Sequence, residues 1–226
     1  IWPSGVEAER FAAAAKARYW PFQGEPIRLV YVGVFLAKRN LLPLSRAVNR
    51  AVSDGQGFIL SLYGDGPLKE ELELVSAAGN RAVCVERPVP HEEVPHILAR
   101  AHVGVTSLPE VGDIKYEASS PIKLFEYMAA GMPVLATSNK CHTDVVGDGR
   151  YAFWADGVDE QTLVNVLHHI WESRTELAQL GSEAQDDVHG WTYAANAAKL
   201  KAALVYGLTR HHYAQATAGR VGVESR

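Results

Sequence analysis

The chain is poor in cysteine, in long apolar runs and in clustered charge of either sign. Its two cysteines, Cys84 and Cys141, lie far apart and lack the neighbouring Cys or His spacing of a zinc site, so we expect reduced packing residues. The longest apolar runs fall far short of the roughly 18 residues that cross a bilayer. The net charge is −4 and Lys and Arg form no long runs, which argues against a nucleic-acid partner.

Metal-binding patterns are also missing. Of the nine histidines, His168 and His169 are adjacent, so their side chains point to different sides of a helix and cannot share a metal ion. We therefore expect no metal site. His142 and Asp144 follow an expected strand at the rim where open α/β sheets bind ligands, and two readings stay open: pocket residues or ordinary loop polarity.

No secretory signal opens the chain, and its first residue is Ile1, so we interpret it as a piece of a longer protein. The 226 residues suffice for one well-buried domain, and 47% are apolar, as in ordinary globular proteins.

Short apolar segments alternate with helical ones, which predicts an α/β fold with a doubly wound, mostly parallel, Rossmann-like sheet. The expected strands are residues 28–32, 58–63, 82–86, 102–106 and 133–137. The expected helices are residues 41–53, 67–78, 91–100, 121–130, 160–172 and an amphipathic 191–208. From residue 209 the chain is polar and rich in small residues, which indicates a flexible tail over 209–226.

The most informative stretch is residues 118–133, which carries its own helix signals. Ser120 is placed to cap the helix, Pro121 suits its first turn, and Gly131 suits the left-handed residue after its end. Apolar side chains then recur at helical spacing and predict a buried face made of Ile122, Phe125, Met128 and Ala129.

Lys123 and Glu126 lie together on a different face of this helix. Exposed N–H groups at residues 120–122 and the charge of Lys123 favour an anion such as a diphosphate. The Glu126 carboxylate offers acceptors for a ribose diol. Spacing alone favours the alternative, in which the two side chains form an ordinary surface ion pair.

The run Ser-Pro-x-Lys-Leu-x-Glu-Tyr-Met-Ala-x-Gly-x-Pro-Val at residues 120–134 resembles the donor-site signature of family 4 GT-B glycosyltransferases, the glycosyl transferases group 1. The resemblance implies that Glu126 holds the nucleotide ribose. Many members carry an earlier glutamate that touches the transferred sugar, where this chain has Ala118, with Glu117 adjacent but displaced. The residue that orients the sugar therefore stays open.

Other segments extend the resemblance to about residue 175. Gly33 ends a strand before a basic loop, and the family pattern puts Arg39, with Lys38 as alternate, against the donor diphosphate. Solvated charges at a turn are the other reading. The turn at 64–67 looks structural. In the loop 87–94 the resemblance implies backbone contacts to the nucleobase, here at Val89.

Together these patterns predict one C-terminal, donor-binding lobe of a GT-B enzyme. Residues 1–25 are expected to lead in from an absent acceptor-binding lobe, and residues 26–208 to bind the nucleotide sugar. The expected donor-site residues are Gly33, Lys38, Arg39, Val89, Ser119, Ser120, Pro121, Ile122, Lys123 and Glu126.

The resemblance further implies a retaining transfer from a nucleotide-diphosphate sugar, with Arg39 and Lys123 in catalytic roles. It implies no obligatory cofactor or metal, polysaccharide assembly as the setting, and a cytoplasmic enzyme. Peripheral association with the inner face of the membrane, through the absent lobe, is the open alternative.

Three rival functions are weighed against this one. The chain could be a nucleotide-sugar-binding module that is inactive alone, since one wall of the cleft is expected elsewhere. A GT-B sugar epimerase would share the donor site, although no signature for it is evident. A flavodoxin-like signalling domain ranks last, because the early acidic cluster and the phosphoacceptor Asp are absent.

Overall fold

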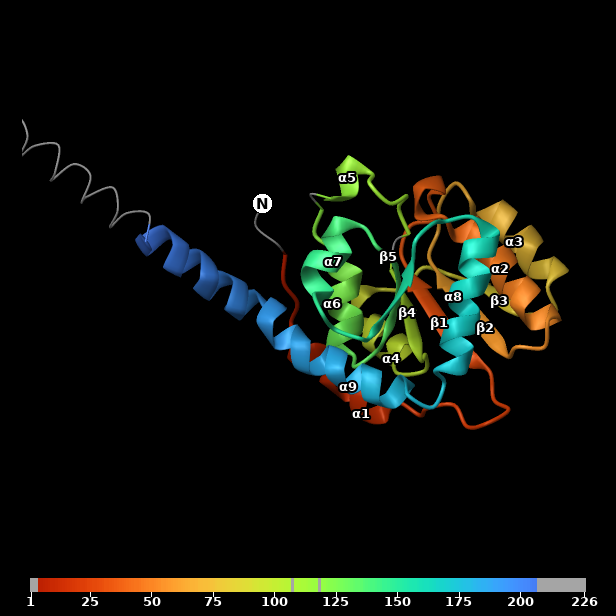
Figure 1. Cartoon of the computed structure of the whole chain (residues 1–226), viewed down its shortest axis with the longest axis horizontal. Helices are drawn as coiled ribbons and strands as arrows, with labels where there is room; N and C mark the ends of the chain where they lie inside the picture. Colours follow the sequence, from red (N-terminus) through yellow and green to blue (C-terminus); the bar gives the residue numbers. More distant parts are fainter. Residues whose placement is uncertain (1–3, 107, 118, 207–226) are drawn as a thin grey trace, which may run out of the picture.

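A six-stranded, all-parallel sheet forms the centre of the protein in a computed structural model that describes residues 4–106, 108–117 and 119–206. The strand order is β3-β2-β1-β4-β5-β6 (Figure 1). The bounds are β1 (Ile27–Val32), β2 (Phe58–Tyr63), β3 (Val83–Glu86), β4 (Val103–Val105), β5 (Val134–Thr137) and β6 (Ala152–Ala155). The order reverses between β1 and β4, where ligands of open α/β sheets bind.

Helices cover both faces of this sheet. They are α1 (Ala8–Ala17), α2 (Leu41–Ser53), α3 (Lys69–Ala78), α4 (Val94–Leu98), α5 (Ile114–Glu117), α6 (Ile122–Ala129), α7 (Lys140–Val146), α8 (Glu160–Glu172) and α9 (Leu177–Asp187). Short 3₁₀ turns are η1 (Ala37–Arg39), η2 (His91–Glu93) and η3 (Val188–Trp191). One layer has α2 against α3 and α8, while the other has α6 against α1 and α9 (Figure 1). The predicted doubly wound α/β fold is confirmed.

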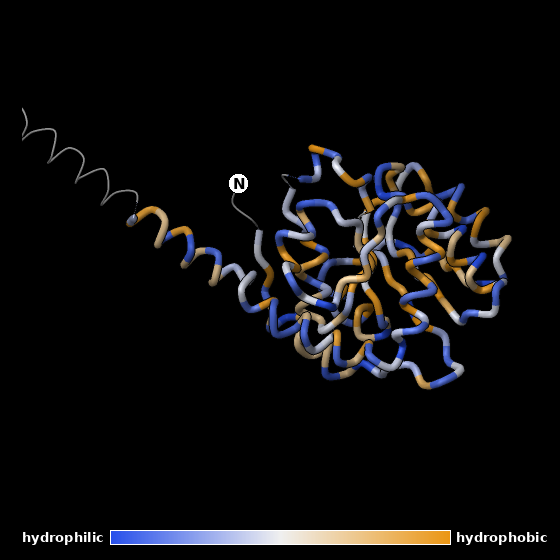
Figure 2. The backbone as a smooth tube through the Cα atoms, viewed as in Figure 1, coloured by the Kyte–Doolittle hydropathy of each residue, from blue (hydrophilic) through white to orange (hydrophobic). Residues whose placement is uncertain are grey.

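The strands are apolar because both faces of the sheet are covered, and the hydrophobic stretches run through the middle of the fold (Figure 2). All five expected strands and the helices at 41–53 and 160–172 are present, with strand ends shifted by at most one residue. The helix expected at 67–78 begins later, at Lys69, since Pro67 lies in a turn. The helix expected at 91–100 is a 3₁₀ turn followed by the short α4. The edge strand β6 and the helices α1, α5, α7 and α9 were not predicted.

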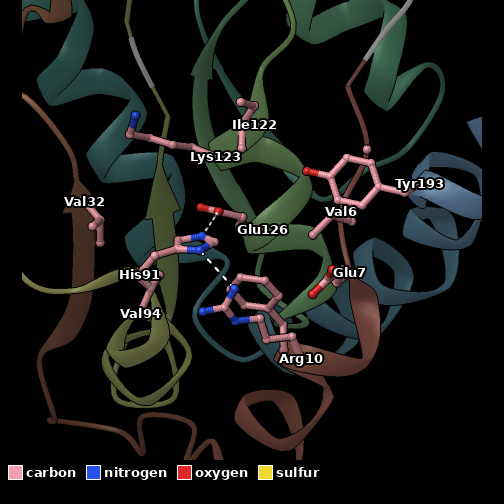
Figure 3. A pocket seen from close by; sticks show the side chains of 12 residues that line it. Val6, Glu7, Arg10, Val32, His91, Val94, Ile122, Lys123, Glu126 and Tyr193 are labelled. Atoms are coloured by element: carbon pink, nitrogen blue, oxygen red, sulfur yellow. Dashed lines mark hydrogen bonds and ion pairs between the residues drawn. The ribbon is translucent and has the colours of Figure 1, made fainter.

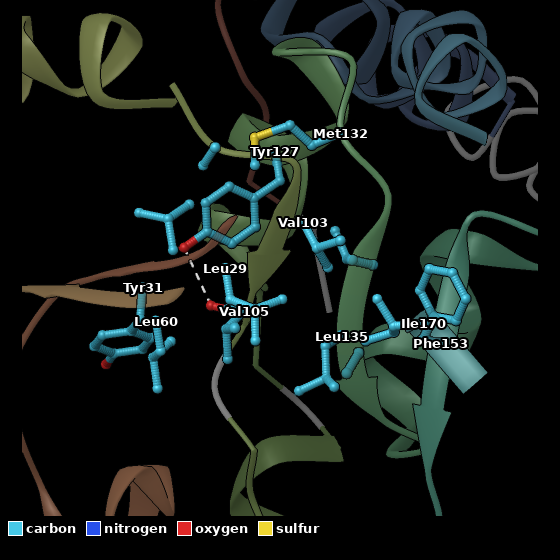
Figure 4. Close-up of a cluster of buried hydrophobic side chains, with 14 of the residues drawn as sticks. Leu29, Tyr31, Leu60, Val103, Val105, Tyr127, Met132, Leu135, Phe153 and Ile170 are labelled. Atoms are coloured by element: carbon cyan, nitrogen blue, oxygen red, sulfur yellow. Dashed lines mark hydrogen bonds between the residues drawn. The ribbon is translucent and has the colours of Figure 1, made fainter. Parts of the chain in front are cut away.

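Helix α6 is fixed to the sheet by an aromatic side chain. The fully buried ring of Tyr127 lies against Gly104 of β4, where a Cβ atom would come within 2.4 Å of the ring. The Tyr127 hydroxyl donates to the carbonyl of Val105 at 3.1 Å (Figure 4). Phe125 stacks on Trp191 with ring centroids 5.5 Å apart. These contacts set which side of α6 faces outward.

A buried arginine joins the lead-in segment to the ends of two helices. Arg18 donates to the carbonyls of Leu98 and Ala101, after α4, and of Ala130 and Gly131, after α6, at 2.6 to 2.8 Å. These are carbonyls that a helix cannot satisfy itself. Burial lowers the pKa of Arg18 to about 10.

The two ends of the described chain differ in how closely they pack against the domain. Residues 5–18 pack closely as part of the fold, with Val6 and Phe11 buried and α1 against α4 and α6. The expected helix at 191–208 is present over residues 193–206. It projects away from the domain, and residues 197–206 are exposed (Figure 1). In the part of the chain that the structure describes, no helix is long and apolar enough to cross a membrane. The predicted tail at 209–226 lies outside the described residues.

Candidate functional site

A crevice lies at the carboxyl ends of β1 and β4, where the strand order reverses. Its larger part is a cavity of about 510 Å³ lined by Gly5, Val6, Glu7, Arg10, Phe11, Val32, His91, Val94, Ile122, Lys123, Glu126 and Tyr193. A smaller hollow of about 220 Å³ is lined by Arg39, Thr106, Tyr116, Ser119, Ser120, Pro121, Ile122, Lys123, Cys141 and His142. Ile122 and Lys123 border both. The first turn of α6 therefore separates two adjoining compartments.

Lys123 reaches across the end of β1. A Cβ atom at Gly33 would lie 2.7 Å from its Cε atom and 2.9 Å from Nζ, so a larger residue at this position would force the end of the Lys123 side chain to shift. Gly33 has φ +149°, in a region that other residues rarely adopt. The Lys123 ammonium lies 5.4 Å from the centre of the Tyr31 ring, within the range of a cation–π contact. Gly33 thus positions Lys123, as well as ending the strand.

Arg39 also lines the smaller hollow, with its guanidinium carbon 5.3 Å from the centre of the Tyr116 ring. Burial and the nearby charge of Arg39 lower the pKa of Lys123. The alternate cation, Lys38, borders a different hollow with Glu110 and Asp113. Of the two basic residues in this loop, the structure therefore brings Arg39 together with Lys123.

The start of α6 differs from its expected form. The Ser120 hydroxyl does not cap the helix; its Oγ accepts a hydrogen bond from the N–H of Ser4 at 2.7 Å, and Pro121 is the N-cap residue. Ile122 is 48% exposed and borders the crevice, so its assignment to the buried face was wrong, whereas Phe125, Met128 and Ala129 are buried as expected. Ile122 is the first residue of the helix, and this first turn borders the crevice.

Glu126 points into the larger cavity, but it does not pair with Lys123. Its Oε1 atom lies 2.7 Å from Nε2 of His91, whose Nδ1 atom lies 3.0 Å from a guanidinium nitrogen of Arg10 (Figure 3). The Glu126 side chain is 12% exposed. Among the ion pairs of the described residues, none joins Lys123 to Glu126, so the surface-pair alternative was wrong.

His91 and Arg10 are cavity residues that the sequence did not reveal. Val89, the expected base contact, is partly buried against the core and is not among the residues that line the cavity. His91, two positions later, does line it. The position of His91 in the loop that follows β3 was the available signal. No sequence signal pointed to Arg10, because it lies on α1 in the lead-in segment and reaches the cavity only in the folded chain.

His142 forms part of the wall of the smaller hollow and is buried. A carbonyl can only accept, so Nδ1 of His142 donates to the Thr137 carbonyl at 2.9 Å, and Nε2 accepts from the Thr106 hydroxyl at 2.8 Å. Burial lowers the pKa of His142. Asp144 pairs with Lys140 on the surface instead. The pocket reading therefore holds for His142, whereas Asp144 lies on the surface of α7 rather than in a loop or a pocket.

Within residues 4–106, 108–117 and 119–206, no three side chains of His, Cys, Asp or Glu are grouped to hold a metal ion. Both cysteines are free. Ala118, which stands where many family members have their first glutamate, lies outside the described residues, and Glu117 is not among the residues lining either compartment. The residue that orients the sugar thus stays open.

The open, doubly wound sheet carries two cations and a carboxylate near its switch point, which is where domains of this fold class bind their ligands. A family model described as glycosyl transferases group 1 matches residues 26–173. The chain belongs to this family, and the identification made from the motif at 120–134 is confirmed.

Individual relatives agree with this assignment. The amylovoran biosynthesis glycosyltransferase AmsK of Erwinia amylovora is 23% identical over 175 residues, which are 76% of this chain and 42% of AmsK. The chain thus spans less than half the length of that curated relative.

Two solved structures share the fold. The C-terminal domain of LpcC, a glycosyl transferase group 1 family protein from Francisella tularensis, superposes with a TM-score of 0.63 at 13% identity, covering 82% of this chain and 97% of that domain. HepE from Anabaena, in complex with UDP, superposes with a TM-score of 0.66 at 15% identity, covering 89% of this chain and 56% of HepE. The predicted GT-B fold is confirmed.

Proposed function

We propose that this chain is the donor-binding half of a retaining glycosyltransferase that uses a nucleotide-diphosphate sugar. The observation that carries the proposal is the placement of two charged side chains along α6, those of Lys123 and Glu126. Glu126 faces a cavity of about 510 Å³, a size typical of small-ligand sites, while Lys123 borders both this cavity and the hollow lined by Arg39. In this proposal the nucleoside binds in the larger cavity, with its ribose diol hydrogen-bonded to Glu126. The diphosphate binds where the two compartments meet, beside Lys123 and Arg39.

The charge distribution supports an anion at this junction. Burial, and then the charge of Arg39, lower the pKa of Lys123, so the two cations stand close enough to destabilise each other. A diphosphate between them would offset that repulsion and be held by charge-assisted hydrogen bonds. Lys38 becomes a second contact only if the loop at 37–40 rearranges, since it borders another hollow.

In the proposed reaction, negative charge develops on the departing diphosphate while the anomeric carbon gains oxocarbenium character. Arg39 and Lys123 stabilise that charge, as preorganised cations do in a crevice that excludes water. No side-chain nucleophile and no obligatory divalent metal take part. The test of this step is transfer by the full-length enzyme with and without a chelator, with the anomeric configuration of the product read by NMR. Chelator-sensitive or inverting transfer would contradict the proposal.

The acceptor is assigned to a second, N-terminal lobe that residues 1–25 adjoin. Two likenesses support this assignment: the matched residues cover only 42% of AmsK, and the LpcC domain that matches is a C-terminal one. We place the complete enzyme in the cytoplasm, with peripheral membrane association through the other lobe as the alternative, to be separated by cell fractionation. The isolated chain is then expected to bind nucleotide and to transfer little or no sugar.

The binding part of the proposal is tested by calorimetry with UDP, GDP and ADP on the purified chain. UDP comes first because HepE was solved with it. Glu126→Gln removes the charge that accepts from the diol, and the loss of hydrogen bonds to a charged group, about 1.5 to 3 kcal/mol, predicts at least tenfold weaker binding. Glu70→Gln, an exposed site on α3, is the matched control. Equal binding by both variants would refute the assigned ribose contact.

A further inference from the structure

The Glu126 carboxylate is hydrogen-bonded to His91, which is in turn hydrogen-bonded to Arg10, and the three residues come from distant parts of the sequence. Arg10 lies on α1, His91 on η2 and Glu126 on α6, and the three meet in the larger cavity (Figure 3). The Phe11 ring lies beside the imidazole of His91 in an edge arrangement, with centroids 6.5 Å apart. We refer to Arg10, His91 and Glu126 as the cavity relay.

The chemistry of the relay fixes its hydrogen atoms. A guanidinium group has only donors, so the contact of 3.0 Å requires Nδ1 of His91 to accept from Arg10. The ring proton of neutral His91 is then on Nε2, which donates to Oε1 of Glu126 at 2.7 Å. The hydrogen bond from Arg10 thereby fixes the histidine tautomer that can donate to the carboxylate, because the partner of one ring nitrogen determines which nitrogen carries the proton.

This hydrogen bond orients Glu126 without using up its acceptors. A carboxylate has about four lone-pair positions, and His91 takes one of them on Oε1. A vicinal diol needs two, so the carboxylate keeps enough acceptors for both hydroxyls. A glutamate side chain has several rotatable bonds, and one fixed oxygen restricts where the other can point.

We propose that His91 and Arg10 are positioning residues that present Glu126 to the ribose diol of the donor. The inference rests on the proposed function, because it assigns the ligand of Glu126. We add that the preference for a nucleotide with both ribose hydroxyls depends on all three residues of the cavity relay. A substitution at position 91 is therefore expected to change the recognition of the sugar hydroxyls more than the binding of the phosphates.

The test measures the affinities of the full chain for UDP and for its 2′,3′-dideoxy analogue by calorimetry. Wild type is expected to bind the analogue at least tenfold more weakly, in line with hydrogen bonds to a charged group. In His91→Leu, which has no donor, this ratio is expected to fall to within about threefold. His91→Gln carries an amide N–H that can replace Nε2 and is expected to restore most of the discrimination.

Matched controls separate this role from a general effect on folding. His96→Leu replaces an exposed histidine on α4 and is expected to leave the ratio unchanged. Thermal unfolding of each variant checks that the fold persists. The tautomer is read from the ¹⁵N signals of the His91 ring, which should show a protonated Nε2 in wild type and a mixture of tautomers in Arg10→Leu.

The outcomes distinguish the relay from the proposed function. If wild type discriminates tenfold and His91→Leu does so equally, the relay is overturned and the ribose contact of Glu126 stands. A protonated Nδ1 in wild type also overturns the relay. If wild type binds neither UDP, GDP nor ADP, or ignores the diol, the proposed function fails and the relay with it.

Discussion

Replacement of Lys123 by Met removes a charge from the crevice and keeps the length of the side chain. An ammonium group about 4 Å from a phosphate gains about 4 kcal/mol at an effective dielectric constant of about 20, before the ammonium and the phosphate lose their water. The net worth of hydrogen bonds to charged groups is about 1.5 to 3 kcal/mol. We therefore expect a loss near 2 kcal/mol, which is roughly 30-fold weaker binding of UDP.

The same substitution should leave the nucleoside largely unaffected. Lys123 lies at the junction of the two compartments, whereas Glu126 points into the larger cavity that is assigned to the nucleoside. Calorimetry should therefore show uridine binding changed by less than about threefold. Lys38→Met removes the same charge from the neighbouring loop and should change UDP binding by less than about threefold, because Lys38 borders a separate hollow.

Two results would refute this reasoning. Equal losses for UDP and uridine would show that Lys123 supports the nucleoside or the fold rather than the diphosphate. Equal effects of Lys38→Met and Lys123→Met would show a general charge effect. The unfolding temperature should change little, because burial, and then repulsion by Arg39, already disfavour the charged form of Lys123 and lower its pKa.

Three further predictions concern Gly33 beside the crevice and two buried basic residues, Arg18 and His102. Gly33→Ala displaces Lys123 and should weaken UDP binding several-fold in a folded protein, and unchanged binding would contradict this. Arg18→Met leaves four carbonyls without their donor and should lower the free energy of unfolding in urea by about 3 kcal/mol; a loss under about 1 kcal/mol would contradict it. Burial, then Arg28 and Arg18, lower the pKa of His102 to about 4, so the folded state disfavours the proton that the unfolded chain binds below about 6.5. Stability present above pH 6.5 is therefore lost as pH falls toward 4, by about 3 kcal/mol, and urea titrations of His102→Gln should lack this loss.

Local sequence signals predicted the elements whose pattern is long and strongly periodic. Helix α2 and strand β2 have the predicted bounds, because each has a clear apolar repeat that agrees with its place in the fold. Strand β6 has only four residues at the edge of the sheet, Ala152–Ala155, and was missed. Helices α7 and α9 were missed as well.

Errors at α6 arose from contacts that the local sequence does not encode. Ser120 is a residue type that often caps helices, yet its hydroxyl oxygen accepts a hydrogen bond from the N–H of Ser4, which is far away in the sequence. Ile122 fits the apolar repeat, yet it stands in the first turn beside the crevice and is half exposed. The pairing of Glu126 with His91 joins residues 35 positions apart, and that of His91 with Arg10 joins residues 81 positions apart. Spacing within one helix could not reveal either.

A crystal structure of the chain with UDP tests the central claim most directly. The account predicts the ribose diol on the Glu126 carboxylate in the larger cavity and the diphosphate between Lys123 and Arg39 at the start of α6. Nucleotide bound away from this crevice, or bound in it with the diphosphate on Glu126's side and the ribose beside Arg39, would contradict the account.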